Sequence, residues 1–416
     1  MIRARTAFVV LMLAFLSASA PAQRNGPIVI TNANVIDGVA AEPMLGATVV
    51  VRDGRIAEVR AGGAQGRQDA GDTAGARVID LKGKWLLPGF IDGHVHITDR
   101  RGARLALRSG VTTARSMGVS HFVDVGLRSL HQGGELELPD FLAAGYHVRP
   151  NVAEQMALDH PDLRDAVLAE LRGEANVRRV VRAMLGHKVD VIKILATERA
   201  GLPDTDPRKR TFSEQEMAAA VDEARKGGIT VAAHAHGDEG AAAAVRAGVK
   251  TIEHGTYLSE ATLKLMAERG ACLDPTIATV GDLVEPGGDY DDALLSIRGT
   301  AMLPRIRETT RNALKLGVTV VAGTDTGYGP QSARRIGHEV MELIALGMPP
   351  MEAIKAATST AAACYGVEKR TGAIRPGLEA DLIVVDRDPR SDASVLLDVL
   401  LVINDGHVAV NRLTQN

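Results

Sequence analysis

The stretch GFIDGHVHI, at residues 89–97, ends an apolar run with two histidines, His94 and His96, one residue apart. In an extended chain, residues i and i+2 point to the same side, so both imidazoles share one face of the strand. Taken alone, the pair fits a metal site and also fits two polar residues on a solvated face. The rest of the sequence is needed to choose between these two interpretations.

From about residue 90 to residue 370, the chain alternates between short apolar runs and helical stretches rich in Ala, Glu and Arg. This alternation indicates βαβ units and a parallel sheet. Seven or eight such runs can be counted, and each ends in polar or ionisable residues. Eight units predict an α/β fold with a (β/α)8 TIM-like barrel over residues 89–371, which places the polar ends at one mouth.

Both ends of the chain have a different texture, with short runs that are rich in Val and Ile and are separated by turn signals. We expect residues 23–88 and 372–416 to form one small β-sandwich domain. The polar, glycine-rich stretch GGAQGRQDAGDTAGA, at 62–76, is expected to be a disordered loop.

The first 22 residues have the pattern of a secretory signal peptide. Arg3 and Arg5 give a basic start, residues 8–16 are apolar, and Ala-Pro-Ala at 20–22 is a small-x-small cleavage site. The apolar run is too short to span a bilayer. The pattern predicts a periplasmic or secreted protein without membrane attachment once the signal is removed.

Composition excludes some partners and some metal sites. The formal net charge of the 416 residues is −3, whereas a nucleic-acid-binding protein shows a basic excess. The two cysteines, Cys272 and Cys364, are too few for a cysteine-ligated zinc site. An exported protein could pair them, but free buried thiols are the default expectation.

Histidines, a lysine and a carboxylate stand at the ends of the predicted barrel strands. Each of them could also have an ordinary structural role. Lys193, in VIKIL, could pair with an acidic residue, and His254, in IEHG, could pair with Glu253. Asp325, in GTDTG, is a residue type that favours turns. Their shared position at the carboxyl ends of strands favours a metal site instead. The candidates are His94, His96, Lys193, His234, His236, His254 and Asp325.

Several motifs together make the chain similar to the amidohydrolase superfamily. They are LLPGFIDGHVHI, VIKI, AHAHG, the EHGT that follows twenty residues later, AGTDTG, and the run from AIKAATSTAA to TGAIRPGLEADLIVVDRDP. The chain most resembles the branch with bacterial prolidase-like and carboxypeptidase-like enzymes, which is related to imidazolonepropionase. These motifs are specific for the superfamily but are poor guides to the substrate.

The resemblance implies two divalent metal ions held by histidine and carboxylate side chains. Because the motifs contain no thiolate, this ligand set suits zinc best, with manganese, cobalt or iron as alternatives. The implied ligands are His94, His96 and Asp325 for the first metal and His234 and His254 for the second.

The resemblance also implies that Lys193 is carboxylated by CO2 on its ε-amine and bridges both metals. A carbamate has two oxygens and a negative charge, which suit two cations, and a lysine loses its proton readily when it is buried near cations. In AHAHG, a spacing of two puts both histidines on the same face, so geometry does not choose the ligand. The resemblance selects His234 and leaves His236 as a catalytic residue that binds the substrate and polarises its carbonyl.

The reaction implied by the resemblance is the hydrolysis of an amide in a dipeptide or an N-acyl amino acid by a metal-bridging hydroxide. Asp325 would take the proton and pass it to the leaving amine. Such substrates carry a free carboxylate, for which Arg115, His147 and Arg149 are the candidate binding residues. The pair His338-Glu339, which opens the last barrel helix, could cap that helix or reach the pocket.

Two alternatives stay open. A cyclic-amide or lactone hydrolase similar to imidazolonepropionase is opposed by the export signal and by the lysine, since that enzyme uses one metal. A non-catalytic binding protein on the same fold would have lost ligands, whereas every expected position is filled here. The expected partner is a small-molecule substrate and not a nucleic acid, and a homo-oligomer is compatible with the sequence.

Overall fold

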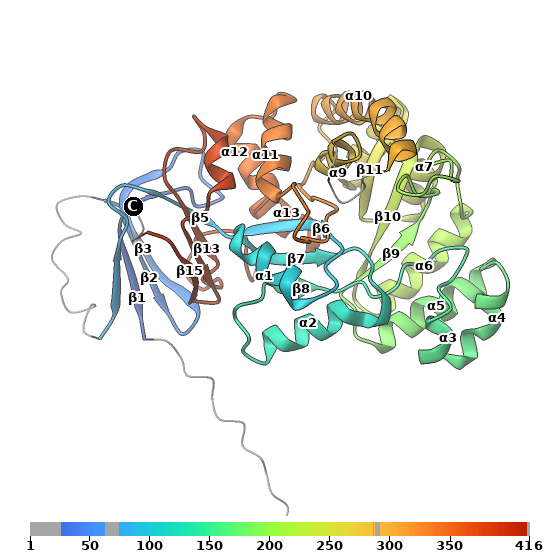
Figure 1. Ribbon diagram of the computed structural model, residues 1–416, viewed down its shortest axis with the longest axis horizontal. Helices are drawn as coiled ribbons and strands as arrows, with labels where there is room; N and C mark the ends of the chain where they lie inside the picture. The colour runs from blue at the N-terminus through green and yellow to red at the C-terminus, as the bar shows by residue number, and fades with distance from the viewer. Residues whose placement is uncertain (1–25, 63–74, 286, 288–291, 414–416) are drawn as a thin grey trace, which may run out of the picture.

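The computed structural model describes residues 26–62, 75–285, 287 and 292–413, so the predicted signal peptide and most of the 62–76 loop lie outside the described residues. Figure 1 shows two lobes, one built by strands from both ends of the chain and the other by the strands and helices between them. Among the described residues, no helix is both long and apolar enough to cross a bilayer.

The smaller lobe is one sheet of eight strands, in the order β15-β14-β13-β5-β1-β2-β3, with β4 also paired to β1. Its apolar core is separate from that of the larger lobe and takes residues from both chain ends, for example Ile30, Val49 and Leu382. The strands are β1 (Ile28–Val35), β2 (Met44–Arg52), β3 (Arg55–Arg60), β4 (Arg77–Asp80), β5 (Trp85–Pro88), β13 (Leu382–Val385), β14 (Leu401–Asn404) and β15 (His407–Asn411).

The larger lobe is the expected barrel of parallel strands. Its strands pair as β6-β7-β8 and as β9-β10-β11-β12, and every pairing is parallel. The residues 318–326 take the eighth position. The strands are β6 (Phe90–Val95), β7 (Val111–Ser116), β8 (Asp140–Leu142), β9 (Val191–Leu195), β10 (Thr230–Gly237), β11 (Thr251–Tyr257) and β12 (Cys272–Asp274).

Short contacts join the two groups of barrel strands. The parallel bridge Val148–Ile194 links the segment after β8 to β9. On the other side, the segment 318–326 bridges to β12 at Leu273 and to β6 at Val95. Because these joins involve single bridges, they leave the carboxyl ends of β6 and of 318–326 as loops that can shape a site.

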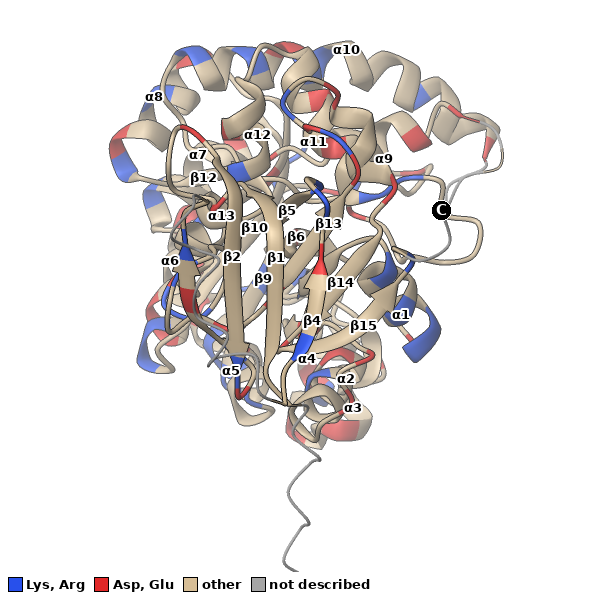
Figure 2. Ribbon diagram, turned by 90° about the vertical axis from the view of Figure 1, so that its left-hand side faces the viewer, with Lys and Arg blue, Asp and Glu red and all other residues tan. Residues whose placement is uncertain are grey.

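Helices cover the barrel from outside. Ser213 and Glu216 form a capping box at the start of α6, and Ser259 caps the start of α8. These caps define the residues at which the two helices begin. Acidic and basic residues are interspersed along the outer helices (Figure 2), in line with the small net charge. The helices are α1 (Arg100–Arg108), α2 (Val123–Gln132), α3 (Met156–Asp159), α4 (Arg164–Leu168), α5 (Glu174–Gly186), α6 (Glu214–Lys226), α7 (Asp238–Ala247), α8 (Glu260–Arg269), α9 (Ile277–Asp282), α10 (Ala293–Lys315), α11 (Ile336–Ala345), α12 (Pro350–Ala356) and α13 (Ser359–Tyr365).

The expectation of free cysteines is wrong, because Cys272 and Cys364 form a disulfide. Cys272 starts β12 and Cys364 lies in α13, and both belong to one small apolar cluster with Ile91 and Val321. Packing of α13 against the amino end of the barrel brings the two Cα atoms within 6.6 Å, a separation that a disulfide can span.

Candidate metal centre and active site

A small cavity at the carboxyl ends of the barrel strands gathers the predicted metal ligands. Its volume is about 40 Å³, which is room for a few water-sized bodies but not for an organic substrate. Nitrogen- and oxygen-bearing side chains line the cavity together with the apolar residues Leu195, Val280 and Leu283. The candidates that line it are His94, His96, Lys193, His234, His236, His254 and Asp325.

His94, His96 and Asp325 form one group of possible ligands. The Nε2 atoms of His94 and His96 lie 3.4 Å and 3.0 Å from Oδ1 of Asp325. Nδ1 of His96 is 2.8 Å from the carbonyl oxygen of Gly118, which orients the ring. Burial favours a protonated Asp325, but the two histidines outweigh it and hold the pKa of Asp325 well below its usual value, so this carboxylate stays charged.

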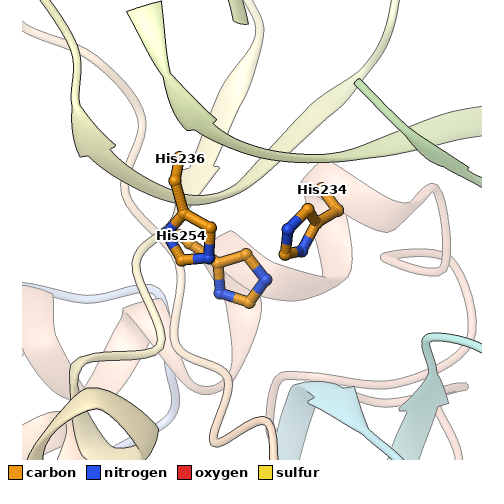
Figure 3. A group of neighbouring side chains, drawn as sticks. All are labelled: His234, His236 and His254. Carbon is orange, nitrogen blue, oxygen red and sulfur yellow. The ribbon is translucent and has the colours of Figure 1, made fainter. Parts of the chain in front are cut away.

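The second group consists of His234, His236 and His254, whose rings converge in Figure 3. The ring centroids of His234 and His254 are 4.6 Å apart, and His236 stacks on His254 at the same distance. Burial lowers the pKa of His236 to about 3 and lowers the pKa of the other two well below the ordinary value. These neutral imidazoles keep free lone pairs, which a bound cation requires.

Hydrogen bonds fix which nitrogen of each ring is committed to the protein. Nδ1 of His254 lies 2.6 Å from the hydroxyl of Thr276, and Nδ1 of His236 lies 2.8 Å from the hydroxyl of Thr256. In His234 it is Nε2 that contacts a protein atom, the carbonyl oxygen of Glu198 at 3.1 Å. Each ring therefore keeps one nitrogen for a ligand, and the geometry does not choose between His234 and His236.

Lys193 lies between the two groups, in the middle of β9. Its Nζ atom is 3.5 Å from Nε2 of His94, and the residue is 2% exposed. No carboxylate among the described residues lies within ion-pair distance of it. Burial is the largest influence on this amine and lowers the pKa of Lys193 to about 8, although Glu253 and Asp325 oppose the shift. A buried lysine without an ion-pair partner is costly as a structural element and is typical of a functional site.

The backbone is strained at two of the candidate ligands. His254 and Asp325 have φ values of 75° and 55°, in the left-handed region. Such conformations cost on the order of 1–3 kcal/mol each and persist where the surroundings impose them. Two strained ligands that face one cavity indicate that the cavity's geometry has a function.

A larger cavity of about 620 Å³ opens next to the small one and shares four wall residues with it. Its size is that of a small-molecule site. Arg149 and Arg199 line it, and within the described residues the side chain of neither has a hydrogen-bond or ion-pair partner. Burial and the nearby Arg199 lower the pKa of Arg149. The shared residues are His96, His147, Arg199 and Asp325.

Of the predicted substrate-binding residues, two line the larger cavity and one lines neither cavity. Arg149 and His147 line the larger cavity, but burial holds the pKa of His147 well below its ordinary value, so it is a neutral residue and not a cation. Arg115 lines neither cavity, against the prediction. It is 2% exposed and donates to Glu253 and Thr251 inside the barrel, one layer below the ligands.

Arg199 was missed by the sequence reasoning because it lies in the loop after β9 and not at a strand end. Arg298 of α10 fixes this loop by donating to the carbonyl oxygens of Ala200, Leu202 and Pro203 at 2.6–2.9 Å. No local sequence motif predicts the position of Arg199, because Arg298, which holds this loop, lies about a hundred residues away in the sequence.

Comparison with known proteins agrees with this geometry. The model of the Amidohydrolase family matches residues 85–409. Ochratoxinase from Aspergillus niger is 34% identical over 224 residues, a match that covers 54% of this chain and 46% of ochratoxinase, so the chain spans about half the length of that relative. Imidazolonepropionase from Symbiobacterium thermophilum is 28% identical, and the match covers 82% of this chain and 84% of that protein.

Solved structures show the same fold over most of the chain. The structure of a Xaa-Pro dipeptidase with bound methionine in its active site has a TM-score of 0.80 and 28% sequence identity. The match covers 92% of this chain and 99% of the dipeptidase.

Proposed function

Because the chain belongs to the amidohydrolase family, we propose that it is a binuclear metal-dependent hydrolase that cleaves the amide bond of a small substrate with a free carboxylate, such as a dipeptide or an N-acyl amino acid. The observation that carries the proposal is the pair of adjoining cavities. The inner one has the size and donor atoms for cations. The outer one has room for a small molecule, and the guanidinium groups of Arg149 and Arg199, which line it, have no hydrogen-bond or ion-pair partner among the described residues.

Lys193 fits the role of a bridging group once CO2 has carboxylated it. A pKa near 8 leaves a useful fraction of the amine unprotonated at neutral pH, and only the neutral amine can add to CO2. The carbamate would then add a negative charge to a centre in which Asp325 is an ionised carboxylate and His234, His236 and His254 are neutral imidazoles. We propose zinc as the metal, held by His94, His96 and Asp325 on one side and by His234 and His254 on the other.

Two divalent cations held by these residues would supply Lewis acidity and would lower the pKa of a bound water molecule. The carboxylate of Asp325 stays ionised beside this position, so it can accept the proton of the attacking water and return it to the leaving amine. His236 is neutral, and when its Nδ1 accepts a hydrogen bond from the hydroxyl of Thr256, its Nε2 carries the proton and can donate to the substrate carbonyl oxygen. A donor at that oxygen stabilises the charge that develops in the transition state.

Arg149 and Arg199 provide the recognition of the free carboxylate in this proposal. Guanidinium groups bind carboxylates through paired hydrogen bonds, and two of them side by side repel each other until an anion arrives. We propose that the amide to be cleaved lies between the inner cavity and these residues. The leaving amino acid then occupies the outer cavity with its carboxylate on the arginine pair.

The proposal includes export to the periplasm or the outside of the cell. The disulfide between Cys272 and Cys364 supports it, since disulfides persist mainly in oxidising compartments. The composition and charge of the predicted signal peptide support it independently.

A substrate screen with matched pairs tests the proposal. Zinc-loaded protein is assayed against dipeptides and N-acyl amino acids, each beside the same compound with its carboxylate converted to a carboxamide, and also against cyclic amides and lactones. We expect turnover of the free acids, a much lower rate with the carboxamides, and none after chelation of the metal. Turnover of lactones alone would favour the imidazolonepropionase-like alternative, and no turnover of any compound would favour a binding protein.

The same preparation separates the two neighbouring histidines. His234→Ala should lower the zinc content, whereas His236→Ala should lower turnover and leave the zinc content at the wild-type value. The reverse pattern would show that His236 is the ligand.

A further inference from the structure

A buried network of charged side chains lies inside the barrel directly below the candidate metal ligands. Its centre is Glu253 of β11, which is completely buried. One carboxylate oxygen of Glu253 is 2.9 Å from Nδ1 of His94. The other accepts hydrogen bonds from Arg115 at 3.2 Å and from the hydroxyl of Thr251 at 2.5 Å.

Arg115 explains why a carboxylate can remain ionised at this depth. A buried anion without a partner would be protonated instead, because removing it from water is very costly. Arg115 is held in place by Thr251, by the carbonyl oxygen of Gly93, and by the ring of Tyr365, whose centroid is 4.3 Å from the guanidinium carbon. Its guanidinium also takes the space next to Glu253, so a further cation between His94 and Glu253 would meet a fixed positive charge.

The contact with Glu253 decides how His94 faces the inner cavity. When Nδ1–H donates to the carboxylate, the lone pair of Nε2 is directed to the side where Lys193 and Asp325 lie, at 3.5 Å and 3.4 Å. A carboxylate acceptor also makes the imidazole a stronger electron donor than a neutral acceptor does.

Asp325 lies 3.0 Å from Nε2 of His96 and 3.9 Å from Nδ1 of His254. Among the described residues, none of the other candidate histidines has a carboxylate besides Asp325 within ion-pair distance. The carbonyl oxygen of Gly118 orients His96, the hydroxyl of Thr276 orients His254, and the carbonyl oxygen of Glu198 contacts His234. All three of these acceptors are neutral. The two halves of the centre are therefore unequal, and the half with His94 has the added negative charge.

We propose that Glu253, kept ionised by Arg115, is a positioning residue that orients and polarises His94 and thereby sets the affinity of the cation site formed by His94, His96 and Asp325. This inference rests on the proposed two-cation centre. It assigns to Glu253 an effect on one of the two sites, which a general contribution to folding would not produce.

Zinc titration of the full chain in competition with a chelator tests this. In Glu253→Gln the amide oxygen can still accept from His94, but the charge is lost. We expect the affinity of one zinc to fall about 10- to 100-fold, which is typical when the hydrogen-bond partner of a metal-binding histidine is mutated. The affinity of the second zinc should stay at the wild-type value, and the zinc-free variant should keep its circular dichroism spectrum.

Asp274→Asn is the matched control. Asp274 is equally buried and offers a carboxylate oxygen within 4.8 Å of a ring nitrogen of His94 and of Glu253. Its hydrogen-bond partner, however, is the hydroxyl of Tyr365 at 3.3 Å and not a candidate ligand. Zinc affinities should therefore be unchanged in this variant. An equal loss in both variants would overturn the proposal, because it would show a general effect of buried charge.

Glu253→Asp keeps the test valid if the glutamine variant does not fold. This change preserves the charge beside Arg115 but withdraws the carboxylate from His94, so the same weakening of one zinc is expected. Wild-type affinity for both zinc ions in Glu253→Asp or in Glu253→Gln would overturn the proposal. The stoichiometry of the wild-type chain separately tests the two-cation centre, so the two failures can be told apart.

Discussion

The disulfide between Cys272 and Cys364 should make a large contribution to the stability of the barrel. It closes a loop with a sequence separation of 92 residues, which contains β12, α9 to α12 and the segment 318–326. For a loop of this length, the chain-entropy relation gives a loss of unfolded-state entropy worth about 4.6 kcal/mol at 25 °C. That is a substantial part of the roughly 5–15 kcal/mol that stabilises a typical folded domain.

Urea denaturation followed by circular dichroism measures this contribution. We expect dithiothreitol to lower the free energy of unfolding of the wild-type chain by a few kcal/mol, up to the calculated value. The double variant C272A/C364A should start near the reduced wild type and should not respond to dithiothreitol. Its alanines replace two cysteines that are 2% and 5% exposed, so a small additional loss from packing is expected.

Two results would refute this reasoning. If dithiothreitol leaves the unfolding curve of the wild type unchanged while free-thiol titration shows that the bond is reduced, loop closure does not stabilise the chain. If an equal amount of dithiothreitol destabilises the double variant as strongly as the wild type, the effect does not come from this disulfide.

Three further outcomes are expected. Lys193→Ala should lower kcat at least a thousandfold, because it removes the bridge, and short-chain carboxylic acids added to the assay should restore part of the activity; wild-type turnover would contradict the role. Arg199→Gln should raise KM for free-acid substrates about 10- to 100-fold, the equivalent of roughly 1.5–3 kcal/mol for a charged hydrogen bond, and should leave KM for carboxamides unchanged. Burial lowers the pKa of His131, but the hydrogen bond from its ring to Asp405 and the nearby carboxylates raise it to about 8, above the ordinary value of 6.5. The stabilisation from this pair is therefore complete below pH 6.5 and lost as the pH rises through 8; the thermal midpoint should fall over that range, and the fall should be smaller in Asp405→Asn.

The barrel and the clustering of the candidate ligands at its mouth could be predicted because strand periodicity and strand ends are local properties of the sequence. An apolar run that ends in His94 and His96 predicts that both side chains lie on the same face of the strand and at the mouth of the barrel. The same reasoning could not predict whether an inward-facing side chain reaches the mouth of the barrel or ends in its interior. Arg115 shares the inward face of β7, but its guanidinium meets Glu253 below the mouth, and no periodic pattern distinguishes these two levels.

Contacts between distant parts of the chain account for the other failures. The pairing of Cys272 with Cys364 depends on how α13 packs on the barrel, and the position of Arg199 depends on hydrogen bonds from α10 to its loop. The capping role of Glu339 was equally undecidable from sequence. Its carboxylate accepts from the backbone N–H groups of Ile277 and Ala278, so it caps the first turn of α9 and lines neither cavity. The helix that the pair His338-Glu339 opens, α11, is capped by His338, whose Nδ1 accepts from the backbone N–H of Arg335 at 3.0 Å.

The cap that Glu339 forms on α9 connects the two strained ligands of the candidate centre. Thr276, at the start of α9, contacts Nδ1 of His254, and the hydroxyl of Thr279 in the same helix donates to the backbone carbonyl of Asp325 at 2.9 Å. Glu339 holds the turn from which both threonines extend. One short helix, capped by a buried carboxylate, therefore positions a ligand from each half of the centre. Since His254 and Asp325 both occupy left-handed conformations that relax if unsupported, the distance between the two halves is set by α9 and not by the barrel strands alone.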